Sequence, residues 1–540
     1  MKVLLITLSG DPEKACRAIN ALFPGADIER VSRDLLENGS MLERLKQVRV
    51  KSPDIFAIMT ESLEWRYGRQ ALMLFGALAG AGRSMIFDAH GRTLSDKRVS
   101  LLLSAPFRFV QGYFRGLLGK RRATKTLSRL ESQAASMQKP SHTLRDHLQV
   151  AYLRATPGPG TQPGGAASHI NGVVKNLTKL GASVTFISND EIAGLDNDRL
   201  KFHKFAPEPD IMPRSTSDIC NGIIFSNAAT SIISSDPPSF IYQRYARFSF
   251  AGVETSLRSG VPLFLEYNGS EVWIGRNWDG TSDLDLLERY ERLNLAAAVR
   301  IFVVSEVEKS NLIKAGISPE KIVVNPNGVD TDAFRPGIGG VEVRHELGIS
   351  AETVLVGFVG TFGPWHGVLT LTDAIAATPL DANIHFLLVG DGSLRSEVEN
   401  RLRNSGDLGR VTFTGTVSHE RVPVMLDACD ILVSPHVPLA EGSDFFGSPT
   451  KLFEYMAAGK GIIASHLGQI GDVLAHNETA LLVEPGNAGD LSMAIMQLAN
   501  DAALRIRLGK AARERAISHH TWRSNAARIL EEFHGLQPSK

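Results

Sequence analysis

Short β-branched runs alternate with helical patterns three times along the 540-residue chain. This alternation is typical of parallel α/β sheets, because each pair of parallel strands needs a crossover connection that is usually a helix. The sequence therefore predicts an α/β fold. The runs expected to form strands are Val3–Leu8, Asp54–Met59, Ser84–Phe87, Gln149–Leu153, Val184–Ser188, Ile223–Phe225, Val261–Tyr267, Ile301–Ser305, Ile322–Val324, Val354–Val359, Ile384–Val389, Val411–Thr414, Ile431–Ser434, Gly461–Ala464 and Ala480–Val483.

The three blocks predict three domains, in keeping with a typical size of roughly 150 residues per domain. In open α/β sheets, ligands bind at the carboxyl ends of the strands, so a cleft between the two larger domains is the expected site. The expected boundaries are a Rossmann-like module with a basic segment at 1–130, a linker at 131–147, a second Rossmann-like domain at 148–325, a third Rossmann-like domain at 326–515, and a C-terminal helix at 516–540 that crosses back to the second domain.

Composition excludes several classes of protein. Lys+Arg and Asp+Glu both number 58, which argues against a generally basic nucleic-acid binder. Cys16, Cys220 and Cys429 are too widely spaced for a disulfide framework or a Cys-based metal site, and they fit a reducing compartment. The apolar run Val3–Leu8 is too short for a signal peptide. No uncharged apolar stretch approaches the length of a membrane span, so we expect a cytoplasmic protein.

The segment Gly442–Gly459 predicts a loop followed by a capped helix. Ser448 suits the N-cap, Pro449 the first helical position and Gly459 the C-terminal stop. Such a helix start leaves backbone N–H groups free, as an anion site requires. Lys451 lies in the first turn, where the helix dipole disfavours a cation unless an anion such as phosphate is bound.

Glu454 lies three residues after Lys451 and therefore on the same helix face. A carboxylate one turn below a phosphate site can accept hydrogen bonds from sugar hydroxyls. The alternative is an ordinary capped helix with a solvent-facing Lys–Glu pair, and the local pattern alone leaves both interpretations open.

This segment, with Asn325–Phe334, Leu388–Gly392 and Phe413–Val417, resembles the nucleotide-sugar half of retaining GT-B glycosyltransferases of the glycogen-synthase-like family, known as family 4 or group 1. Residues 164–187 are similar to the opening of that family's acceptor domain. The resemblance covers roughly residues 148–535. It implies a GT-B architecture in which an acceptor-side domain at 148–325 and a nucleotide-sugar-binding domain at 326–515, both Rossmann-like, face a cleft. It also implies transfer of a sugar from a nucleoside diphosphate sugar to an acceptor hydroxyl with retention of anomeric configuration.

The resemblance also implies a role for each matching residue. Gly164 and Gly165 match the glycine loop that faces the donor phosphate, with a flexible loop as the alternative. Glu454 matches the glutamate that binds the donor ribose. The other expected donor contacts are the diphosphate-binding helix start at Ser448, Thr450 and Lys451, the glycine turn at Gly390 and Gly392, which could also be a plain tight turn, and Thr416 and Val417, where the nucleotide base meets backbone.

Three positions depart from the family pattern. The family has two glutamates eight positions apart, and Phe446 stands where the first would be, although Glu441 or Asp444 nearby could serve. Thr361 and His366 stand where the family has an Arg and a Lys that neutralise the diphosphate. A neutral His366 can still donate a hydrogen bond, and its pKa should rise beside a diphosphate. A plain turn histidine is the alternative.

The acceptor domain offers no match for the family's frequent catalytic histidine. Asn268 and Glu271 are the polar candidates at that strand end, and a structural turn is equally open. The family's retaining mechanism needs no strong protein base, because the leaving phosphate helps to deprotonate the acceptor. The catalytic candidates are therefore His366, Lys451, Asn268 and Glu271.

Asp283-Leu-Asp285 is an Asp-x-Asp pair, which binds a metal diphosphate in another class of glycosyltransferases. Here the pair opens a helical pattern, so capping and complementarity to the helix dipole explain it. We expect no metal, and no cofactor besides the nucleotide-sugar substrate.

Residues 97–129 contain nine Lys or Arg and no acid. Phe107, Val110, Phe114, Leu117 and Leu118 fall at helical spacing in this stretch, and Pro106 suits a helix start. A basic amphipathic helix of this kind predicts contact with an anionic membrane surface, peripheral on its inner face, near lipid-linked acceptors. The alternative is a helix packed on the first domain with a solvated basic face.

Two other functions stay open beside a transferase of surface polysaccharide or glycolipid synthesis. One is a non-catalytic nucleotide-sugar-binding relative, which the departures at Thr361, His366 and Phe446 favour and the intact helix start at Ser448–Lys451 disfavours. The other is a sugar-nucleotide epimerase of the same fold, which would turn over the donor without an acceptor. The nucleotide, the sugar and the acceptor are not specified by the sequence.

Overall fold

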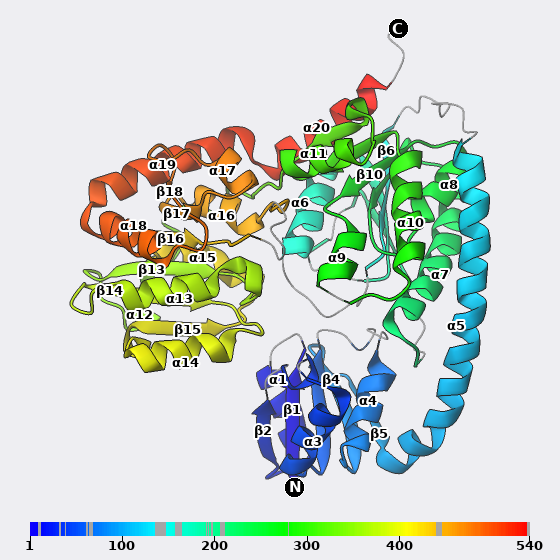
Figure 1. The fold of residues 1–540 in the computed structure, drawn as a ribbon, viewed down its shortest axis with the longest axis horizontal. Coiled ribbons are helices and arrows are strands. Elements are labelled where there is room, and N and C mark those ends of the chain that lie inside the picture. Colours follow the sequence, from blue (N-terminus) through cyan, green and yellow to red (C-terminus); the bar gives the residue numbers. More distant parts are fainter. Residues whose placement is uncertain are drawn as a thin grey trace. The chain divides into compact units, whose positions relative to one another are not determined.

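The computed structural model describes residues 1–8, 12–31, 34–37, 39–60, 63, 68–135, 147–156, 165–190, 192, 194–195, 198–205, 211–278, 280–438 and 445–536. The chain divides into two compact units: unit 1 comprises Met1–Pro163 and Ala182–Ile301, and unit 2 comprises Gly164–Gly181 and Phe302–Lys540. Parallel sheets flanked by helices build both units, so the predicted α/β class is confirmed (Figure 1). The domain boundaries expected from the sequence stay a prediction.

The first sheet of unit 1 is formed by the N-terminal residues. Its strand order is β2-β1-β3-β4-β5, in which β4 and β5 pair antiparallel and the others pair parallel. Buried residues of β1 alternate between two cores, one on each face of the sheet. The elements are β1 (Lys2–Thr7), α1 (Pro12–Leu22), β2 (Asp27–Val31), α2 (Asp34–Glu37), α3 (Met41–Lys51), β3 (Ile55–Thr60), α4 (Arg69–Leu78), β4 (Arg83–Asp88) and β5 (Thr93–Lys97).

Helix α5 (Arg98–Ala135) follows β5 directly and contains 38 residues. Pro106 lies inside it, so the prediction that this proline starts the helix is wrong. The reason is the burial of Leu101 and Ala105 in the core of the first sheet, which holds the chain helical before the proline. Packing here outweighs the local cost of an interior proline.

The second sheet has the order β12-β11-β10-β9-β6-β7-β8, and the boundary between the two units falls within β11. Its paired strands from β10 to β8 run parallel. The elements are β6 (Gln149–Arg154), β7 (Ser183–Ser188), β8 (Leu200–Lys204), α7 (Arg214–Ser235), β9 (Phe240–Arg244), α8 (Ala251–Ser259), β10 (Leu263–Tyr267), α9 (Glu271–Asn277), α10 (Leu284–Ala297), β11 (Arg300–Val303) and β12 (Ile322–Val324).

One predicted strand is wrong: Ile223–Phe225 lies in the middle of α7. Buried residues of this helix recur every three or four positions, as at Ile219, Gly222, Phe225 and Ala229. A three-residue apolar run cannot distinguish a strand from a buried helix segment. The chain also forms β2, β5, β8 and β9, which the prediction omits. No residue of β2, β5 or β8 is fully buried, so these strands lack the continuous apolar signal of a buried parallel strand.

The third sheet lies wholly in unit 2, with the order β15-β14-β13-β16-β17-β18. All of its recorded pairs are parallel. The chain starts in the middle at β13, builds outwards to β15, and then returns to the other side of β13 at β16. This reversal makes the carboxyl ends of β13 and β16 the switch point at which open α/β sheets bind ligands. The strands are β13 (Val354–Val359), β14 (Ile384–Val389), β15 (Val411–Gly415), β16 (Ile431–Ser434), β17 (Gly461–Ser465) and β18 (Leu481–Val483).

Helices surround this sheet and complete unit 2. The C-terminal helix α20 packs on α6, where Trp522 lies so close that a Cβ on Gly172 would be 2.2 Å from its ring. The helices are α6 (Gly165–Lys179), α11 (Glu306–Lys314), α12 (Gly340–Glu346), α13 (Val368–Ala377), α14 (Arg395–Ser405), α15 (Val422–Ala428), α16 (Thr450–Ala458), α17 (Gln469–Val473), α18 (Ala488–Asn500), α19 (Ala502–His519) and α20 (Trp522–Gly535), with short 3-10 turns at Pro319–Lys321, Pro364–His366, Leu408–Arg410 and His419–Arg421.

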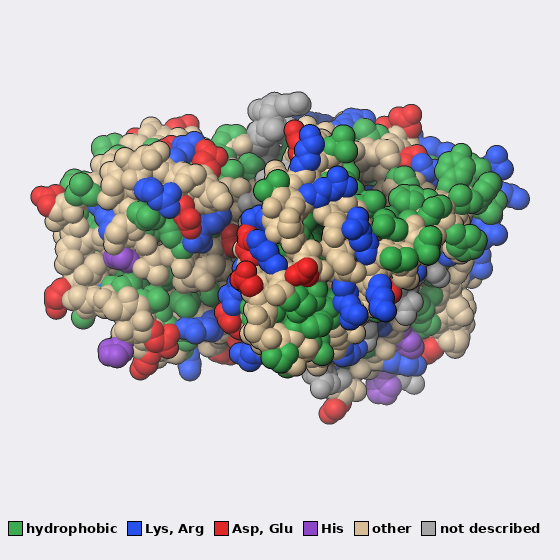
Figure 2. Space-filling model, turned by 90° about the horizontal axis from the view of Figure 1, so that it is seen from below, with side chains coloured by type: hydrophobic (Ala, Val, Ile, Leu, Met, Phe, Trp, Pro, Cys, Tyr) green, Lys and Arg blue, Asp and Glu red, His purple; other side chains and the backbone are tan. Residues whose placement is uncertain are grey.

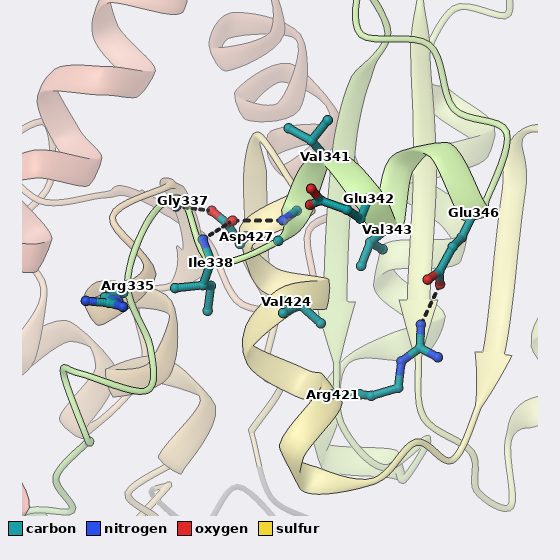
Figure 3. A pocket seen from close by; sticks show the side chains of 12 residues that line it. Arg335, Gly337, Ile338, Val341, Glu342, Val343, Glu346, Arg421, Val424 and Asp427 are labelled. Carbon is teal, nitrogen blue, oxygen red and sulfur yellow. Dashed lines mark hydrogen bonds and ion pairs between the residues drawn. The ribbon is translucent and has the colours of Figure 1, made fainter.

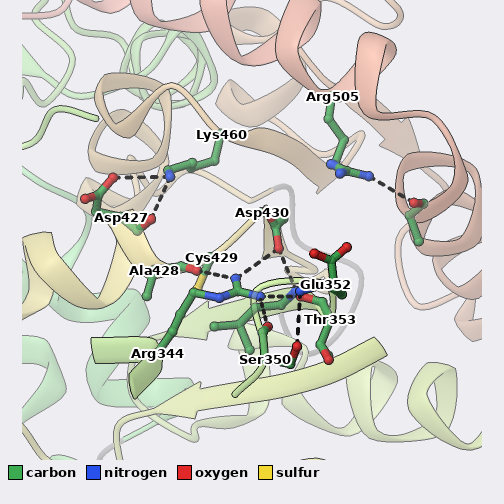
Figure 4. Close-up of polar contacts among 12 residues, drawn as sticks. Arg344, Ser350, Glu352, Thr353, Asp427, Ala428, Cys429, Asp430, Lys460 and Arg505 are labelled. Atoms are coloured by element: carbon green, nitrogen blue, oxygen red, sulfur yellow. Dashed lines mark hydrogen bonds and ion pairs between the residues drawn. The ribbon is translucent and has the colours of Figure 1, made fainter. Parts of the chain in front are cut away.

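A polar network fastens the amino-terminal ends of β13 and β16, opposite the switch point (Figure 4). Arg344 of α12 donates to Ala428 O at 2.8 Å and to the Asp430 carboxylate at 3.1 Å. Asp430 also accepts the Leu355 N–H at 2.8 Å. These bonds leave the opposite, carboxyl ends of the two strands for a ligand.

Candidate functional site

Helix α16 begins at the switch point of the third sheet. Val359, the last residue of β13, donates its N–H to the Tyr455 hydroxyl at 2.8 Å, which fixes α16 beside that strand end. Pro449 is the N-cap, and no side chain caps the helix. The predicted cap is therefore wrong by one residue: Ser448 Oγ accepts the Asn327 N–H at 3.3 Å instead of a bond from the helix. Leu452 donates its N–H to Pro449 O at 3.0 Å, and no side chain among the described residues caps the N–H groups of Thr450 and Lys451, which can therefore serve an anion.

Asn327 joins this helix start to α6. Its side-chain amide donates to Ser448 O at 2.5 Å, and its Oδ1 lies 2.5 Å from Nδ1 of the buried His169. His169 in turn packs edge-on against Trp522, with ring centroids 5.3 Å apart. This chain of contacts holds the beginning of α6 at the beginning of α16.

Gly165, the first residue of α6, lies directly against Thr450, the first residue of α16. A Cβ on Gly165 would lie 3.0 Å from Thr450 Oγ1. Two helix starts thus converge with only glycine and a small hydroxyl between them, as the predicted phosphate loop requires. Gly164, the other predicted loop glycine, is outside the described residues.

Lys451 is 7% exposed. Its Nζ lies 4.4 Å from the Phe358 ring centroid and 3.4 Å from His366 Nδ1. Burial lowers the pKa of Lys451 to about 7, although Glu454 acts in the opposite direction. No ion pair to this amine is found among the described residues. A buried cation without a carboxylate partner suits a site that receives its counter-charge from a ligand.

His366 forms a short relay with His436, which follows β16. The His366 Nδ1 lies 3.4 Å from His436 Nε2, and His436 Nδ1 lies 3.1 Å from Ser434 Oγ. Burial, Lys451 and His436 together lower the pKa of His366, so it is neutral. The distances are consistent with Ser434 donating to His436 and His436 donating to His366. His366 then carries its proton on Nε2 and keeps one donor for a ligand.

Glu454 is 8% exposed, and no hydrogen bond or ion pair to its carboxylate is found among the described residues. Burial raises the pKa of Glu454 to about 7, against the lowering effect of Lys451. A buried carboxylate left without donors is costly unless a ligand supplies them. Hydroxyl groups of a ribose would do so.

The predicted glycine turn lies after β14. Gly390 has a φ of +130°, and a Cβ there would lie 2.0 Å from Gly360 O. Gly390 thereby lets the loops after β13 and β14 pack on each other. Gly360 lies against the Lys451 side chain, because a Cβ on Gly360 would be 2.5 Å from Lys451 Nζ. Thr361, at the position of the family's arginine, is exposed.

The remaining donor candidates follow β15. Thr416 is exposed and Val417 is half-buried, and both lie in the loop between β15 and the turn at His419–Arg421. Phe446, at the position of the missing glutamate, is buried, and its carbonyl accepts the Ser305 hydroxyl at 2.8 Å. Glu441 and Asp444 lie outside the described residues.

Asn268 and Glu271 belong to unit 1. Asn268 donates to Glu266 Oε1 at 2.7 Å, and Glu266 also accepts from Tyr152 and Arg244. Glu271, the first residue of α9, has its carboxylate 3.1 Å from Arg247 Nε. Both candidates are therefore held in place by charged neighbours, which suits a positioning role better than proton transfer.

The capping explanation for Asp283 is wrong in part. Asp283 occupies the N-cap of α10 but makes no side-chain cap hydrogen bond. Its two carboxylate oxygens each accept from Lys120 Nζ of α5 at 2.8 Å. Within the described residues, no group of three or more His, Cys, Asp or Glu side chains is arranged to hold a metal ion.

A cavity of about 790 Å³ lies elsewhere in unit 2, between α12 and α15 (Figure 3). Asp427 lines it, but its carboxylate already accepts three N–H groups, from Gly337, Ile338 and Gly340, at 2.8–2.9 Å. This saturated carboxylate has no capacity left for a ligand, and none of the predicted site residues lines the cavity.

His169, Asn327 and His436 are site residues that the sequence analysis did not single out. His169 and Asn327 are 158 positions apart, so their contact exists only in the fold. His436 carried one available signal, because it lies two residues beyond the predicted strand Ile431–Ser434, at the switch point.

A glycine-flanked helix start at the switch point of a parallel sheet, with a buried lysine and glutamate, defines a nucleotide-binding α/β protein. Residues 353–501 match the family model "Glycosyl transferases group 1", and residues 163–333 match "Glycosyltransferase Family 4". An uncharacterized glycosyltransferase of Methanocaldococcus jannaschii is 34% identical over 287 residues, which cover 53% of this chain and 72% of that protein. The chain belongs to the group 1 and family 4 glycosyltransferases.

A second relative is the GDP-mannose-dependent alpha-(1-6)-phosphatidylinositol monomannoside mannosyltransferase of Mycobacterium tuberculosis. It is 27% identical over 214 residues, which cover 39% of this chain and 55% of that protein. The chain thus matches only about half of this relative's length. Neither family model extends to the residues before 163.

Solved structures share the fold. Sucrose-phosphate synthase from Thermosynechococcus elongatus aligns with a TM-score of 0.59 and 22% identity, over 72% of this chain and 99% of its own. HepE of Anabaena in complex with UDP aligns with a TM-score of 0.58 and 19% identity, over 72% of this chain and all of its own. These likenesses confirm the predicted GT-B architecture. No helix in the described part of the chain is long and apolar enough to cross a membrane.

Proposed function

We propose that this glycosyltransferase moves a sugar from a nucleoside diphosphate sugar to an acceptor hydroxyl with retention of anomeric configuration. The observation that carries the proposal is a buried lysine and a buried glutamate on α16, neither of which forms an ion pair within the described residues. Lys451 lacks an anion and Glu454 lacks donors within the described residues. A diphosphate next to a ribose supplies both in one ligand.

The donor half of the reaction follows from these positions. The diphosphate binds where the starts of α6 and α16 converge, so their N–H groups and Lys451 stabilise the charge that develops on the leaving phosphate. His366 contributes the N–H on Nε2 that its neighbours leave free. Glu454 accepts from the ribose, Gly390 shapes the adjoining loop, and Thr416 and Val417 line the base.

The acceptor half needs orientation rather than a strong base. As the bond from the sugar to the phosphate breaks, the acceptor oxygen forms the new bond on the same face, and its proton passes to the leaving phosphate. Asn268 and Glu271 are then positioning residues, each held by a charged neighbour. Fixing the reactants in this geometry lowers the barrier without further chemistry from the protein. No metal is required in this scheme, because Lys451 and the helix starts neutralise the diphosphate.

We further propose a carbohydrate or lipid-linked acceptor, in surface polysaccharide or glycolipid synthesis at the inner face of a membrane. Two observations support it. The mycobacterial relative is by its name a phosphatidylinositol monomannoside mannosyltransferase, hence a transferase to a glycolipid. The three cysteines are free thiols, as in a reducing compartment.

A second candidate is a nucleotide-sugar-binding relative without turnover. The specific observation in its favour is Phe446, a buried apolar residue at the position of the family's first glutamate. An epimerase of the same fold is the third candidate, and it predicts donor turnover without an acceptor.

Calorimetric titration with UDP, GDP and ADP tests the proposal on the wild type and on Glu454→Ala. We expect selective binding of one nucleotide, weakened by about 1–3 kcal/mol in the variant, the range for loss of a charged hydrogen bond. Glu346→Ala, which removes an exposed glutamate of the same unit, is the control and should bind like the wild type. Absence of nucleotide binding by the folded wild type would overturn the donor site.

With the preferred nucleotide known, its sugar conjugates are offered with glycolipid and oligosaccharide acceptors. Product anomers are then read by NMR spectroscopy. A product with the donor's configuration supports the retaining transferase, binding without product with any acceptor supports the second candidate, and an altered donor sugar without acceptor supports the third.

A further inference from the structure

Helix α5 has two apolar faces, and only one is used inside unit 1. The inward face packs on α4, α7 and α10. Three glycines on it bring α5 very close to its neighbours: a Cβ at Gly112, Gly116 or Gly119 would lie within 2.2–2.5 Å of Ile211, Thr216 or Cys220. The inward residues recur at steps of three, four or seven positions and are Leu101, Ala105, Gly112, Gly116, Gly119, Ala123, Leu127 and Leu130.

The outward face of α5 is apolar and exposed. Of 22 large hydrophobic residues exposed in the described parts of the chain, nine belong to this one helix, so they form a patch rather than the usual scatter. Their exposed fractions run from 39% to 78%. Six of them recur at steps of four and three residues, from Val99 through Leu103, Phe107, Val110 and Phe114 to Leu117, which puts them on one side of the helix. The nine are Val99, Leu103, Phe107, Phe109, Val110, Tyr113, Phe114, Leu117 and Leu118.

Figure 2 shows hydrophobic side chains gathered on the side of the molecule where α5 lies, with Lys and Arg side chains beside them. The basic residues of the helix serve two purposes. Arg108, Lys120 and Arg129 bind inside unit 1, to Gln70, Asp283 and Glu254. Arg121, Arg122 and Lys125 are exposed. Since Leu117, Arg121 and Lys125 are four residues apart, the apolar face continues into a cationic one.

We propose that the outward face of α5 docks on an anionic lipid bilayer. Its aromatic and aliphatic side chains enter the boundary between headgroups and acyl chains, while Arg121, Arg122 and Lys125 contact lipid phosphates. Tyr113 suits this depth, because its ring is apolar and its hydroxyl is polar. The inference gives the proposed membrane location its contact surface and does not depend on the sugar-transfer chemistry.

Charge complementarity selects a bilayer over a second copy of the chain. Residues 97–129 contain no acidic side chain, and the one acidic residue of α5, Glu131, is already paired with Arg289, so an identical α5 offers the exposed cations no free carboxylate. An anionic surface satisfies both halves of the face at once, the apolar half by burial and the cationic half by attraction.

The test is flotation of the full-length protein with vesicles of phosphatidylcholine alone or of equimolar phosphatidylcholine and phosphatidylglycerol. We expect binding to the anionic vesicles, weakened by salt because exposed charges are screened. Arg121→Glu with Lys125→Glu should weaken binding about twentyfold or more, at roughly fivefold per lost charge. Phe107→Ser with Phe114→Ser should weaken it about tenfold or more, through lost apolar burial.

Matched controls lie on unit 2. Lys314→Glu with Arg523→Glu reverses two exposed charges, and Leu380→Ser with Ile506→Ser removes two exposed aliphatic residues. Both should float like the wild type. Circular dichroism and thermal unfolding of every sample check folding of both units, and because flotation needs neither nucleotide nor transfer, loss of flotation by a folded variant tests α5 alone.

Three outcomes would overturn the proposal. One is equal binding to neutral and anionic vesicles. Another is binding that the α5 variants leave unchanged. The third is a wild type that does not bind vesicles but forms dimers, which the Phe107→Ser with Phe114→Ser variant disrupts. That result would make the outward face of α5 an interface with a second copy of the chain.

Discussion

At the scale of single residues, the proposed donor site combines a lysine whose pKa burial lowers with a glutamate whose pKa burial raises. Each pKa is shifted towards 7 from opposite sides, at Lys451 from 10.5 and at Glu454 from 4.5. Burial disfavours the charged form of both groups. A nucleotide bound as proposed would offset this desolvation cost, because its phosphate pairs with the ammonium group and its ribose donates to the carboxylate.

The first prediction concerns Lys451 and pH. Because its pKa is lowered, the amine of the free protein loses its proton as pH rises through about 7, and a diphosphate needs the ammonium form. Nucleotide affinity should therefore fall above that pH by up to about tenfold per pH unit. Lys451→Met should abolish this decline and cost about 1.5–3 kcal/mol of affinity at lower pH. Titration calorimetry across the pH range measures both.

Lys460→Met is the control for this prediction, because Lys460 is a half-buried lysine of the same unit that pairs with Asp427 at 3.2 Å. It should keep the wild-type pH profile. If Lys451→Met keeps the wild-type pH dependence of nucleotide affinity, Lys451 does not bind the diphosphate.

The second prediction concerns the stability of the free protein. The raised pKa of Glu454 means that the native state binds more protons than the unfolded state between pH 4.5 and about 7. Stability is therefore lost as pH rises through this window, and the loss is complete above it. Glu454→Gln should stabilise the free protein by about 1–3 kcal/mol at about pH 8 and by little at about pH 5, while weakening nucleotide binding. Urea unfolding at the two pH values measures this, and equal effects at both would contradict it.

At the scale of elements, the proposed phosphate site depends on the close approach of the starts of α6 and α16. The third prediction is that Gly165→Ala lowers nucleotide affinity about tenfold with little change in Tm. Its Cβ would lie 3.0 Å from Thr450 Oγ1 and must push the two helix starts apart, which is a local displacement of a site rather than a core defect.

The double variant Gly165→Ala with Thr450→Ala should recover part of that affinity, since it removes Thr450 Oγ1, the atom that the new Cβ would approach most closely. Gly409→Ala is the matched control, because a Cβ there meets nothing within 4 Å. Equal losses in the control, or no recovery in the double variant, would mean that the spacing of the helix starts is not what matters.

The elements also show what the sequence can specify. Buried parallel strands such as Val354–Val359 and Ile384–Val389 are continuous apolar runs, and their predicted bounds match the structure. β5 and β8 do not carry that signal, because exposed strand residues need not be apolar. The predicted N-cap at Ser448 is wrong because the Ser448 hydroxyl accepts the N–H of Asn327, 121 residues away in the sequence, instead of an N–H of the helix. Long-range contacts of this kind leave no local trace.

At the scale of the whole molecule, the family resemblance located Lys451, Glu454 and His366 from motif order, but not their partners. His436 and Asn327 become site residues only when β16 and the loop after β12 reach α16 in the fold. Motif order therefore selects the candidate ligand-binding residues, whereas the residues that hold them in place can be found only from the fold. The same limit applies to α5. Its sequence predicts an amphipathic basic helix, but only the fold shows that three of its basic residues bind partners inside unit 1.

The last prediction separates the two units by function. If the donor site lies where α6 meets α16, nucleotide alone should protect backbone amides of unit 2 from hydrogen exchange, around residues 165–170, 360–367 and 450–458. A nucleotide at about 100 times its Kd stabilises a binding unit by about 2.7 kcal/mol, so protection there should rise up to about 100-fold where exchange requires unfolding of that unit. Amides of α5 and of the first sheet, in unit 1, should be unchanged. Lys451→Met under the same conditions is the control and should show little protection. Equal protection of both units, or protection confined to unit 1, would relocate the donor site and contradict the assignment of Lys451 and Glu454.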